Sequence, residues 1–186
     1  FIIFKAVDRI EGCPTGTFME VIDMNGEMVL GLAEVDIFDK MTPEWLSKHL
    51  SVLKRSKYII VDLNCPKDTI EFLNSFAIKY NIPIALMTVS VQRLNNLPDY
   101  LGGIKVLVTK HNETAAYFDM EVETDEDLKD AVKKWLDKGP EHVFISKGNA
   151  KIAYGSQDDG VHIFNYSSEQ DDRYNWGMNE AFCAGV

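Results

Sequence analysis

The chain has 186 residues, 46% of them hydrophobic, and a formal net charge of -10. It is long enough to bury one substantial core. Its acidic charge lacks the excess of basic residues that would attract nucleic acid or an anionic membrane. The sequence also has no apolar run of the roughly 20 residues needed to span a bilayer. Its three cysteines are isolated, which argues against a disulfide framework and for a reducing, cytoplasmic compartment. Its four histidines are scattered, which argues against a metal-binding motif.

The first part of the chain predicts a small β structure. It begins with Phe-Ile-Ile-Phe-Lys, without an initiator methionine or the basic start of a signal peptide, so we expect a fragment of a longer chain. Two β-rich runs, 17–23 and 27–33, flank Asn25-Gly26, a pair that tolerates the positive φ of a type I′ hairpin turn. We therefore expect residues 1–40 to form part of a β flap or lid with its lead-in strands.

A strand and a helix are expected after this hairpin. Glu34 and Asp36 alternate within an expected strand, 33–38, which would put both carboxylates on one face of an exposed edge, where solvation accounts for them. Thr42 then offers a capping hydroxyl, and Pro43 suits the first position of a helix. The helix is expected to continue to about residue 53, because apolar side chains recur at helical spacing up to that point.

From residue 57 onward, apolar strands alternate with amphipathic helices. This order predicts a parallel α/β sheet with right-handed crossovers, whose strands are covered on both faces. Residues 41–186 are therefore expected to form the α/β core. The expected strands are 57–63, 82–90, 104–110, 142–147, 151–156 and 161–166, and the expected helices lie around 70–80, 91–98 and 124–136, with a last helix opening after Trp176.

In sheets of this kind ligands bind beyond the carboxyl ends of the strands. Each candidate at those ends also has an ordinary structural interpretation. Asp62 and Asn64 can form a strand-end turn, and Lys110 and Lys147 can either face phosphate groups or be solvated. The segments that the rule selects are 62–64, 88–90, 109–111, 147–148 and the terminal turn around Gly177.

A series of short phrases carries a family resemblance. In chain order they are the Asn-Gly hairpin, AEVDIF, TPEWL, VDLN, VSVQR, LVTKHNETAAYF, VFISKGNAK and GMNEAFCAG. In this order they resemble the ribokinase, or PfkB, family of ATP-dependent sugar and nucleoside kinases, and among its subfamilies most closely the pseudouridine kinases. The resemblance implies a ribokinase-like three-layer α/β sandwich with a mostly parallel sheet and a small β lid, a lid that often serves as a dimer surface in relatives.

The most specific motif of that family reads Gly-Ala-Gly-Asp-Ala-Phe. This chain has Gly177, Met178, Asn179 and Glu180 at the first four of these positions. In the family, N–H groups at the start of the helix form an anion hole for the transferred phosphoryl group, and the aspartate takes a proton from the acceptor hydroxyl. The resemblance therefore implies Glu180 as the catalytic base and the three preceding residues as the anion hole. Without it, Glu180 is a favourable first-turn acid of a helix.

Glu180 and Asn179 depart from the family pattern. Glutamate has nearly the same intrinsic pKa as aspartate, but its extra methylene moves the carboxylate by roughly an ångström, a misplacement that can cost on the order of 100-fold in rate. Asn179 replaces a glycine and fills space that glycine leaves open. The expected catalytic site is therefore recognisable but altered.

Two further motifs also depart from it. The family's Asn-x-x-Glu pattern, aligned on Ala115, falls on His111 and Thr114, so the neighbouring Asn112 and Glu113 are offset by one residue and are expected to point elsewhere. The family's Gly-x-x-Gly hairpin near the nucleotide keeps Gly148 but has Lys151 at the second glycine.

Two hypotheses of function follow from the resemblance. The first is an enzyme that uses ATP and Mg²⁺ to phosphorylate a sugar or nucleoside hydroxyl, with pseudouridine favoured. Lys147 and Gly148 would then lie beside the nucleotide, no residue would be a metal ligand, and a homodimer would form through the flap. The second is a catalytically impaired relative that binds a nucleoside, a nucleotide or a protein partner without turnover, because three motifs carry substitutions.

Overall fold

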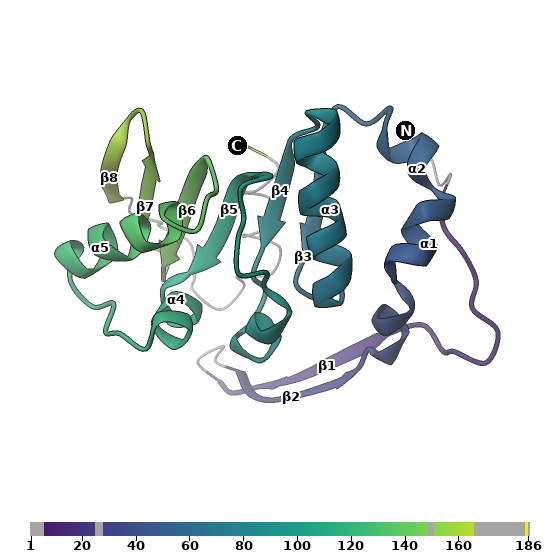
Figure 1. Cartoon of the computed structure of the whole chain (residues 1–186). Coiled ribbons are helices and arrows are strands. Elements are labelled where there is room, and N and C mark those ends of the chain that lie inside the picture. Colours follow the sequence, from purple (N-terminus) through teal and green to yellow (C-terminus); the bar gives the residue numbers. More distant parts are fainter. Residues whose placement is uncertain (1–5, 25–27, 149–150, 166–184, 186) are drawn as a thin grey trace.

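A computed structural model describes residues 6–24, 28–148, 151–165 and 185 of the chain (Figure 1). Its central feature is a six-stranded sheet in which every strand pairs with the next one along the chain. The first three strand pairings are parallel and the last two are antiparallel, so the predicted mostly parallel α/β sheet is confirmed. The strands are β3 (Ile59–Asp62), β4 (Ile84–Met87), β5 (Ile104–Lys110), β6 (His142–Lys147), β7 (Lys151–Ser156) and β8 (Gly160–Asn165).

The parallel strands are joined by helical crossovers. Helix α3 (Lys67–Tyr80) joins β3 to β4, the 3-10 helix η2 (Val91–Asn96) joins β4 to β5, and α4 (His111–Phe118) and α5 (Asp125–Leu136) join β5 to β6. The start of α5 follows from its sequence, because the Thr124 hydroxyl accepts a hydrogen bond from the Asp127 N–H at 3.2 Å and the Asp127 carboxylate accepts one from the Thr124 N–H at 2.8 Å. Helices α3, α4 and α5 lie on one face of the sheet (Figure 1).

The main hydrophobic core fills the space between these helices and the sheet. Trp135 of α5 is fully buried in it and stacks on Tyr117 of α4, with ring centroids 4.8 Å apart. The indole N–H of Trp135 donates a hydrogen bond to the Thr114 hydroxyl at 3.1 Å, which satisfies a polar group that burial would otherwise leave unpaired. This packing fixes α4, and with it the end of β5 from which α4 starts.

The opposite face of the sheet is less uniformly buried. Ala85, Val106 and Val108 form a small buried cluster there. Ile60 of β3, however, is 61% exposed, so the expectation that strand 57–63 is covered on both faces is wrong within the described residues. Helix α3 covers β3 on one face (Figure 1), whereas on the other face β3 lies at the margin of the described sheet, outside the small buried cluster of Ala85, Val106 and Val108.

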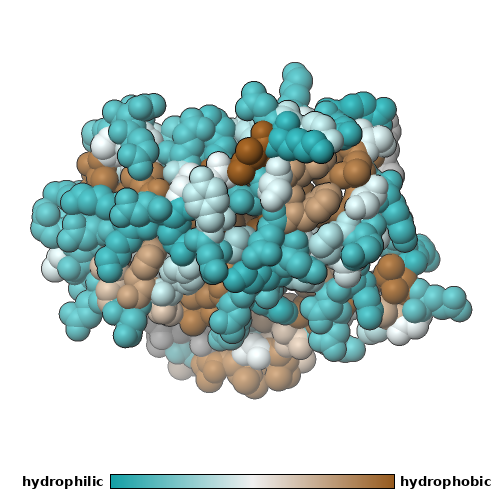
Figure 2. Space-filling model, viewed as in Figure 1, coloured by the Kyte–Doolittle hydropathy of each residue, from teal (hydrophilic) through white to brown (hydrophobic). Residues whose placement is uncertain are grey.

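The predicted hairpin forms a separate two-stranded sheet of β1 (Thr17–Ile22) and β2 (Met28–Glu34). The Asn25-Gly26 turn itself lies outside the described residues. In Figure 1 the hairpin runs beneath the carboxyl ends of β3, β4 and β5. Apolar side chains gather over it at the lower margin of Figure 2, and on one of its faces Met19, Val21, Leu30 and Leu32 are each about half exposed or more.

The segment between the hairpin and the sheet differs from the prediction. Glu34 ends β2, and residues 36–40 form the 3-10 helix η1 (Asp36–Lys40) instead of continuing the strand, so Glu34 and Asp36 do not share a strand face. The helix expected up to residue 53 breaks at His49 into α1 (Pro43–Lys48) and α2 (Leu50–Leu53). Thr42 caps α1 as predicted, its hydroxyl accepting from the Trp45 N–H at 3.3 Å.

Within the described ranges, no helix has the length and apolar character needed to cross a bilayer.

Candidate functional site at the carboxyl edge of the sheet

A small hollow opens where β4 and β5 end, at the edge predicted to bind ligands. Its volume is about 90 Å³. Strand ends and the start of α4 converge on it, and its lining includes two threonines, a glutamate and a lysine. The lining residues are Met87, Thr88, Val89, Val108, Thr109, Lys110 and Glu113.

Glu113 is the buried carboxylate of this hollow. It lies in the first turn of α4, and only 2% of the residue is exposed. One of its oxygens, Oε2, accepts a short hydrogen bond from the Thr88 hydroxyl and another from the Lys110 N–H at 3.0 Å. The Thr109 hydroxyl lies 3.4 Å from the same oxygen. A carboxylate that is removed from water needs such donors, and here they come from the ends of two adjacent strands.

Thr88 leads into a strained turn. Val89 has a φ of +67°, which is unusual for a residue branched at Cβ. The Ser90 N–H donates to the Thr88 carbonyl at 2.8 Å, an i to i+2 bond that makes this a γ-turn of the rare positive-φ kind. Such a conformation costs about 1–3 kcal/mol and persists only where the surroundings fix it. Strain of this kind is concentrated at functional sites, and this turn forms part of the wall of the hollow.

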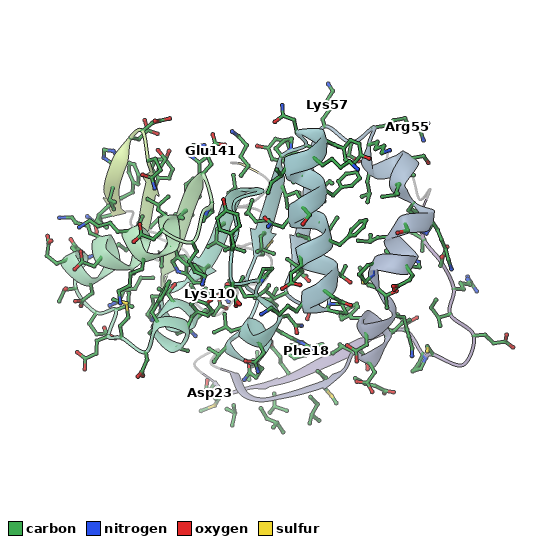
Figure 3. All side chains as sticks on the ribbon, in the orientation of Figure 1. Phe18, Asp23, Arg55, Lys57, Lys110 and Glu141 are labelled. Atoms are coloured by element: carbon green, nitrogen blue, oxygen red, sulfur yellow. The ribbon has the colours of Figure 1, made fainter. Side chains whose placement is uncertain are left out.

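Lys110 provides the positive charge at this edge. It ends β5, and Figure 3 shows it at the lower end of the sheet, on the side where Phe18 and Asp23 of the hairpin lie. Within the described part of the chain its ammonium takes part in none of the ion pairs or side-chain hydrogen bonds. A lysine that lines a hollow and keeps its donors is suited to contact an anion.

Lys147, the lysine predicted to lie beside a nucleotide, is engaged within the protein. Its ammonium donates to the Val122 carbonyl at 2.9 Å, the Glu123 carbonyl at 2.6 Å and the Glu123 carboxylate at 2.8 Å. An ammonium has three donors, and these contacts account for all of them. The hydrogen bond and the charge of Lys147 lower the pKa of Glu123 below its ordinary value. Lys147 therefore ties the end of β6 to the loop that precedes α5.

Gly148 follows directly, with a φ of +56° that favours glycine over other residues. A Cβ added there would meet no described atom within 4 Å. The sequence requirement at this position is therefore conformational, and it is compatible with a turn whose backbone approaches a ligand.

The strand-end turn after β3 satisfies its own polar groups. One oxygen of the Asp62 carboxylate accepts from the Asn64 N–H at 2.9 Å, and the other accepts from the Asn64 side-chain amide at 3.1 Å. Cys65 follows, and burial together with the charge of Asp62 raises its thiol pKa to about 12. These contacts support the ordinary interpretation of Asp62 and Asn64 as a turn, and Cys65 is an inert core residue.

Glu180, Gly177, Met178 and Asn179 lie outside the described residues, so the predicted base and anion hole stay predictions. Among the residues with described positions, no group of three or more histidines, cysteines or acids could hold a metal ion. Sequence reasoning missed Glu113, which it expected to point elsewhere. The structure places Glu113 in the hollow, because α4 starts directly after Lys110 and its first turn folds back over the strand ends.

A larger hollow of about 340 Å³ lies at the opposite, amino edge of the sheet. It is lined on one side by the end of α3 and on the other by Gly102, Gly103, Lys105 and Glu141. Lys105 and Glu141 form an ion pair of 2.7 Å there. We assign the site to the smaller hollow, because parallel α/β sheets bind their ligands at the carboxyl edge and the strained turn lies there.

Comparisons with known proteins agree with this geometry. The family model for the pfkB family carbohydrate kinases matches residues 2–170. A protein named uncharacterized sugar kinase YeiI, from Escherichia coli, is 21% identical over 178 residues, which cover 96% of this chain and 48% of that protein. The pseudouridine kinase of Escherichia coli is 22% identical over 145 residues, covering 78% of this chain and 46% of that protein.

A solved structure shares the fold. The ribokinase of Arabidopsis thaliana, complexed with ribose and ATP, superimposes with a TM-score of 0.62 at 17% identity, over 92% of this chain and 57% of that one. The chain thus spans about half the length of the curated relatives it matches.

Proposed function

The chain belongs to the pfkB family of carbohydrate kinases, and on this premise we propose that the protein transfers the γ-phosphoryl group of ATP to a hydroxyl group of a sugar or nucleoside. Pseudouridine is the favoured acceptor, supported by similarity to pseudouridine kinases at 22% and 29% identity. The observation that carries the proposal is the match over residues 2–170, together with a hollow at the carboxyl edge that contains Lys110.

In the proposed reaction the acceptor oxygen attacks the γ-phosphorus in line while the bond to the leaving ADP oxygen breaks. Glu180 takes the proton of the attacking hydroxyl, and the backbone N–H groups of Gly177, Met178 and Asn179 stabilise the charge on the transferred group. Catalysis of this type depends mainly on positioning and electrostatics. Among the described residues, we assign the contact with the phosphates to Lys110 in preference to Lys147, because the donors of Lys147 are already used.

We propose Mg²⁺ as the cofactor that enters with ATP and neutralises phosphate charge. A nucleotide-bound Mg²⁺ keeps several waters and takes one or two carboxylates in addition to phosphate oxygens. We assign no protein ligand to it, and we propose a cytoplasmic location from the isolated cysteines.

The hairpin supports a further part of the proposal, a homodimer that forms through the flap. A two-stranded sheet is marginally stable in water, and this one exposes Met19, Val21, Leu30 and Leu32 on one face. Covering that face with a second copy would bury these side chains. Light scattering of the full-length protein should show a dimer, and Leu30→Asp should shift it to a monomer, with the exposed Val7→Asp as the control. A monomeric wild-type protein would refute the dimer.

The second candidate is a relative that binds nucleotide or nucleoside without turnover. It is favoured by the changes at Asn179 and Glu180 and by the engagement of Lys147 within the protein.

One set of measurements separates the two candidates. ADP release from the full-length protein is followed with ATP, Mg²⁺ and a panel of sugars and nucleosides, while calorimetry measures ATP binding. Phosphorylation of pseudouridine ahead of the other acceptors supports the first proposal. ATP binding with no product supports the second. The double variant Asn179→Gly and Glu180→Asp provides the internal check, because a strong gain in turnover would identify a kinase site that has drifted in sequence.

A further inference from the structure

The end of β4 is held by three contacts that converge on Thr88. Its N–H donates to the Val108 carbonyl at 3.2 Å, and its hydroxyl oxygen lies 2.9 Å from that of Thr109. The same hydroxyl donates to the Glu113 carboxylate, which also accepts the Lys110 N–H. Thr88, Thr109 and Glu113 are all nearly fully buried. One carboxylate therefore joins the last residues of two adjacent strands to the first turn of a helix.

The residue after Thr88 is the strained one. Val89 has a positive φ, and it is restrained by the buried Thr88 on one side and by the Ser90–Thr88 hydrogen bond that closes the turn. A strained turn relaxes when its restraints are removed. The Val89 turn and Lys110 line the same hollow, so loosening Thr88 would change the wall of the hollow and the starting point of the Lys110 side chain together.

We propose that Glu113 is a positioning residue: through Thr88 and the Lys110 N–H it holds the strained Val89 turn and Lys110 in the arrangement that phosphoryl transfer requires. The proposal rests on the proposed kinase function. Glu113 acts as a hydrogen-bond acceptor for the protein itself, and its burial and its bonds to protein donors favour this role over direct contact with a substrate.

Variants of Glu113 distinguish a positioning role from direct contact with the substrate. Glu113→Gln keeps an oxygen that can accept from Thr88 and Lys110 but removes the charge, whereas Glu113→Ala removes the acceptor. If Glu113 positions the strand ends, the alanine variant should lower kcat by about 10- to 100-fold, because small misplacements at a reacting centre have effects of this size. The KM for ATP should change less than kcat, and the glutamine variant should retain most of the activity.

Thr88→Val tests the same connection from its other end. It removes the donor to Glu113 but keeps the shape of the side chain. It should reproduce the loss seen in Glu113→Ala, and the double variant should be no worse than either single one, because both break the same link. Glu141→Ala, at the amino edge of the sheet, is the control for removing a carboxylate elsewhere and should leave kcat unchanged.

Amide hydrogen exchange provides a readout that does not need turnover. In the full-length protein, Glu113→Ala should speed exchange of the Ser90 and Lys110 amides, while Glu113→Gln should leave both protected. If the wild-type protein has no kinase activity, the kinase function fails, and exchange still decides whether Glu113 holds the strand ends. Unchanged exchange in Glu113→Ala, or a glutamine variant as inactive as the alanine one, would overturn the positioning role.

Discussion

Replacing Lys147 by methionine removes its ammonium and keeps most of its length and apolar stem. In the folded protein the ammonium bonds to the carbonyls of Val122 and Glu123 and to the Glu123 carboxylate. The ion pair itself adds little, because the Glu123 side chain is 73% exposed and solvent screens the attraction. The two carbonyl bonds contribute about 1 kcal/mol each, since their donor is charged but partly solvated.

The expected loss for Lys147→Met, from the two carbonyl bonds, is therefore about 2 kcal/mol in the free energy of unfolding, or about 4–8 °C in Tm for a protein of this size. Affinity for ATP should change by less than about threefold, a difference of under 1 kcal/mol. Urea unfolding and calorimetry with ATP measure the two quantities on the same full-length protein. Lys133→Met is the matched control, because its ion pair with Asp130 has both side chains 63% exposed and should contribute less than about 0.5 kcal/mol.

The reverse pattern would refute this reasoning. If Lys147→Met left the unfolding midpoint unchanged and weakened ATP binding more than tenfold, Lys147 would be a nucleotide contact whose bonds to the loop are incidental. Lys110→Met provides the complementary case, and it should weaken ATP binding with a smaller change in stability.

The Lys147–Glu123 pair also predicts a pH dependence. Lys147 lowers the pKa of Glu123 in the folded state, so the stabilisation is present above the ordinary glutamate pKa of about 4.3 and is lost as pH falls through the lowered folded value. The stability difference between the wild-type protein and Lys147→Met should accordingly shrink below about pH 4. A difference that grows as pH falls would contradict the assignment of the pair.

Three other predictions concern the packing around the site. Trp135→Phe should lower the free energy of unfolding, measured with urea, by about 1–3 kcal/mol, because it leaves the Thr114 hydroxyl without its buried partner. An unchanged free energy of unfolding would contradict a stabilising role for that hydrogen bond. In a variant whose other two cysteines are serine, Cys65 should react with iodoacetamide at pH 8 only after unfolding, because its thiol pKa is about 12. Rapid labelling of the folded protein would disprove its burial. Gly148→Ala should lower the free energy of unfolding by about 1–2 kcal/mol, because alanine is strained at the positive φ of this position. Gly148→Asn should lower it by less, because asparagine tolerates a positive φ better than alanine does.

The parts of the fold that the sequence predicted best depend on local signals. Strands 104–110, 142–147 and 151–156 have the predicted bounds, since each is a short β-rich run between turn residues. Helix α5 begins at the predicted cap, because Thr124 and the acid three residues later satisfy each other without help from the rest of the chain.

The break at His49 could not be predicted in this way. The leucines on either side of it keep their helical spacing, so the pattern reads as one helix. In the structure the His49 N–H turns to the Leu46 carbonyl at 2.8 Å, and its ring lies against Trp45, which also bonds to Asp8 at 2.8 Å. A contact with a residue 37 positions away is invisible to a local pattern.

The role of Glu113 was hidden for a related reason. Alignment with the family's Asn-x-x-Glu motif put Glu113 one residue from the motif's glutamate. Because a shift of one residue turns a side chain to another face of a helix, Glu113 was expected to point away from the site. The structure places it by where α4 starts, and α4 starts at His111, directly after β5 ends at Lys110. The available signal was Thr88, directly after β4, and Thr109, the last residue but one of β5, because buried hydroxyls at adjacent strand ends need hydrogen-bond partners nearby.

The surroundings of the two strand-end lysines bear on how this acidic chain could bind the polyanion ATP. With a net charge of -10, the protein repels ATP at long range, so affinity requires cations at the site that no carboxylate of the protein already neutralises. Lys110 and Lys147 occupy equivalent places in the sequence, each at the carboxyl end of a parallel strand. Only Lys147 has a carboxylate partner among the described residues, and the one carboxylate in the hollow with Lys110 accepts from its backbone N–H. Glu113 accepts the Lys110 N–H, and Lys110 is therefore the lysine that we expect to contact ATP, in preference to Lys147.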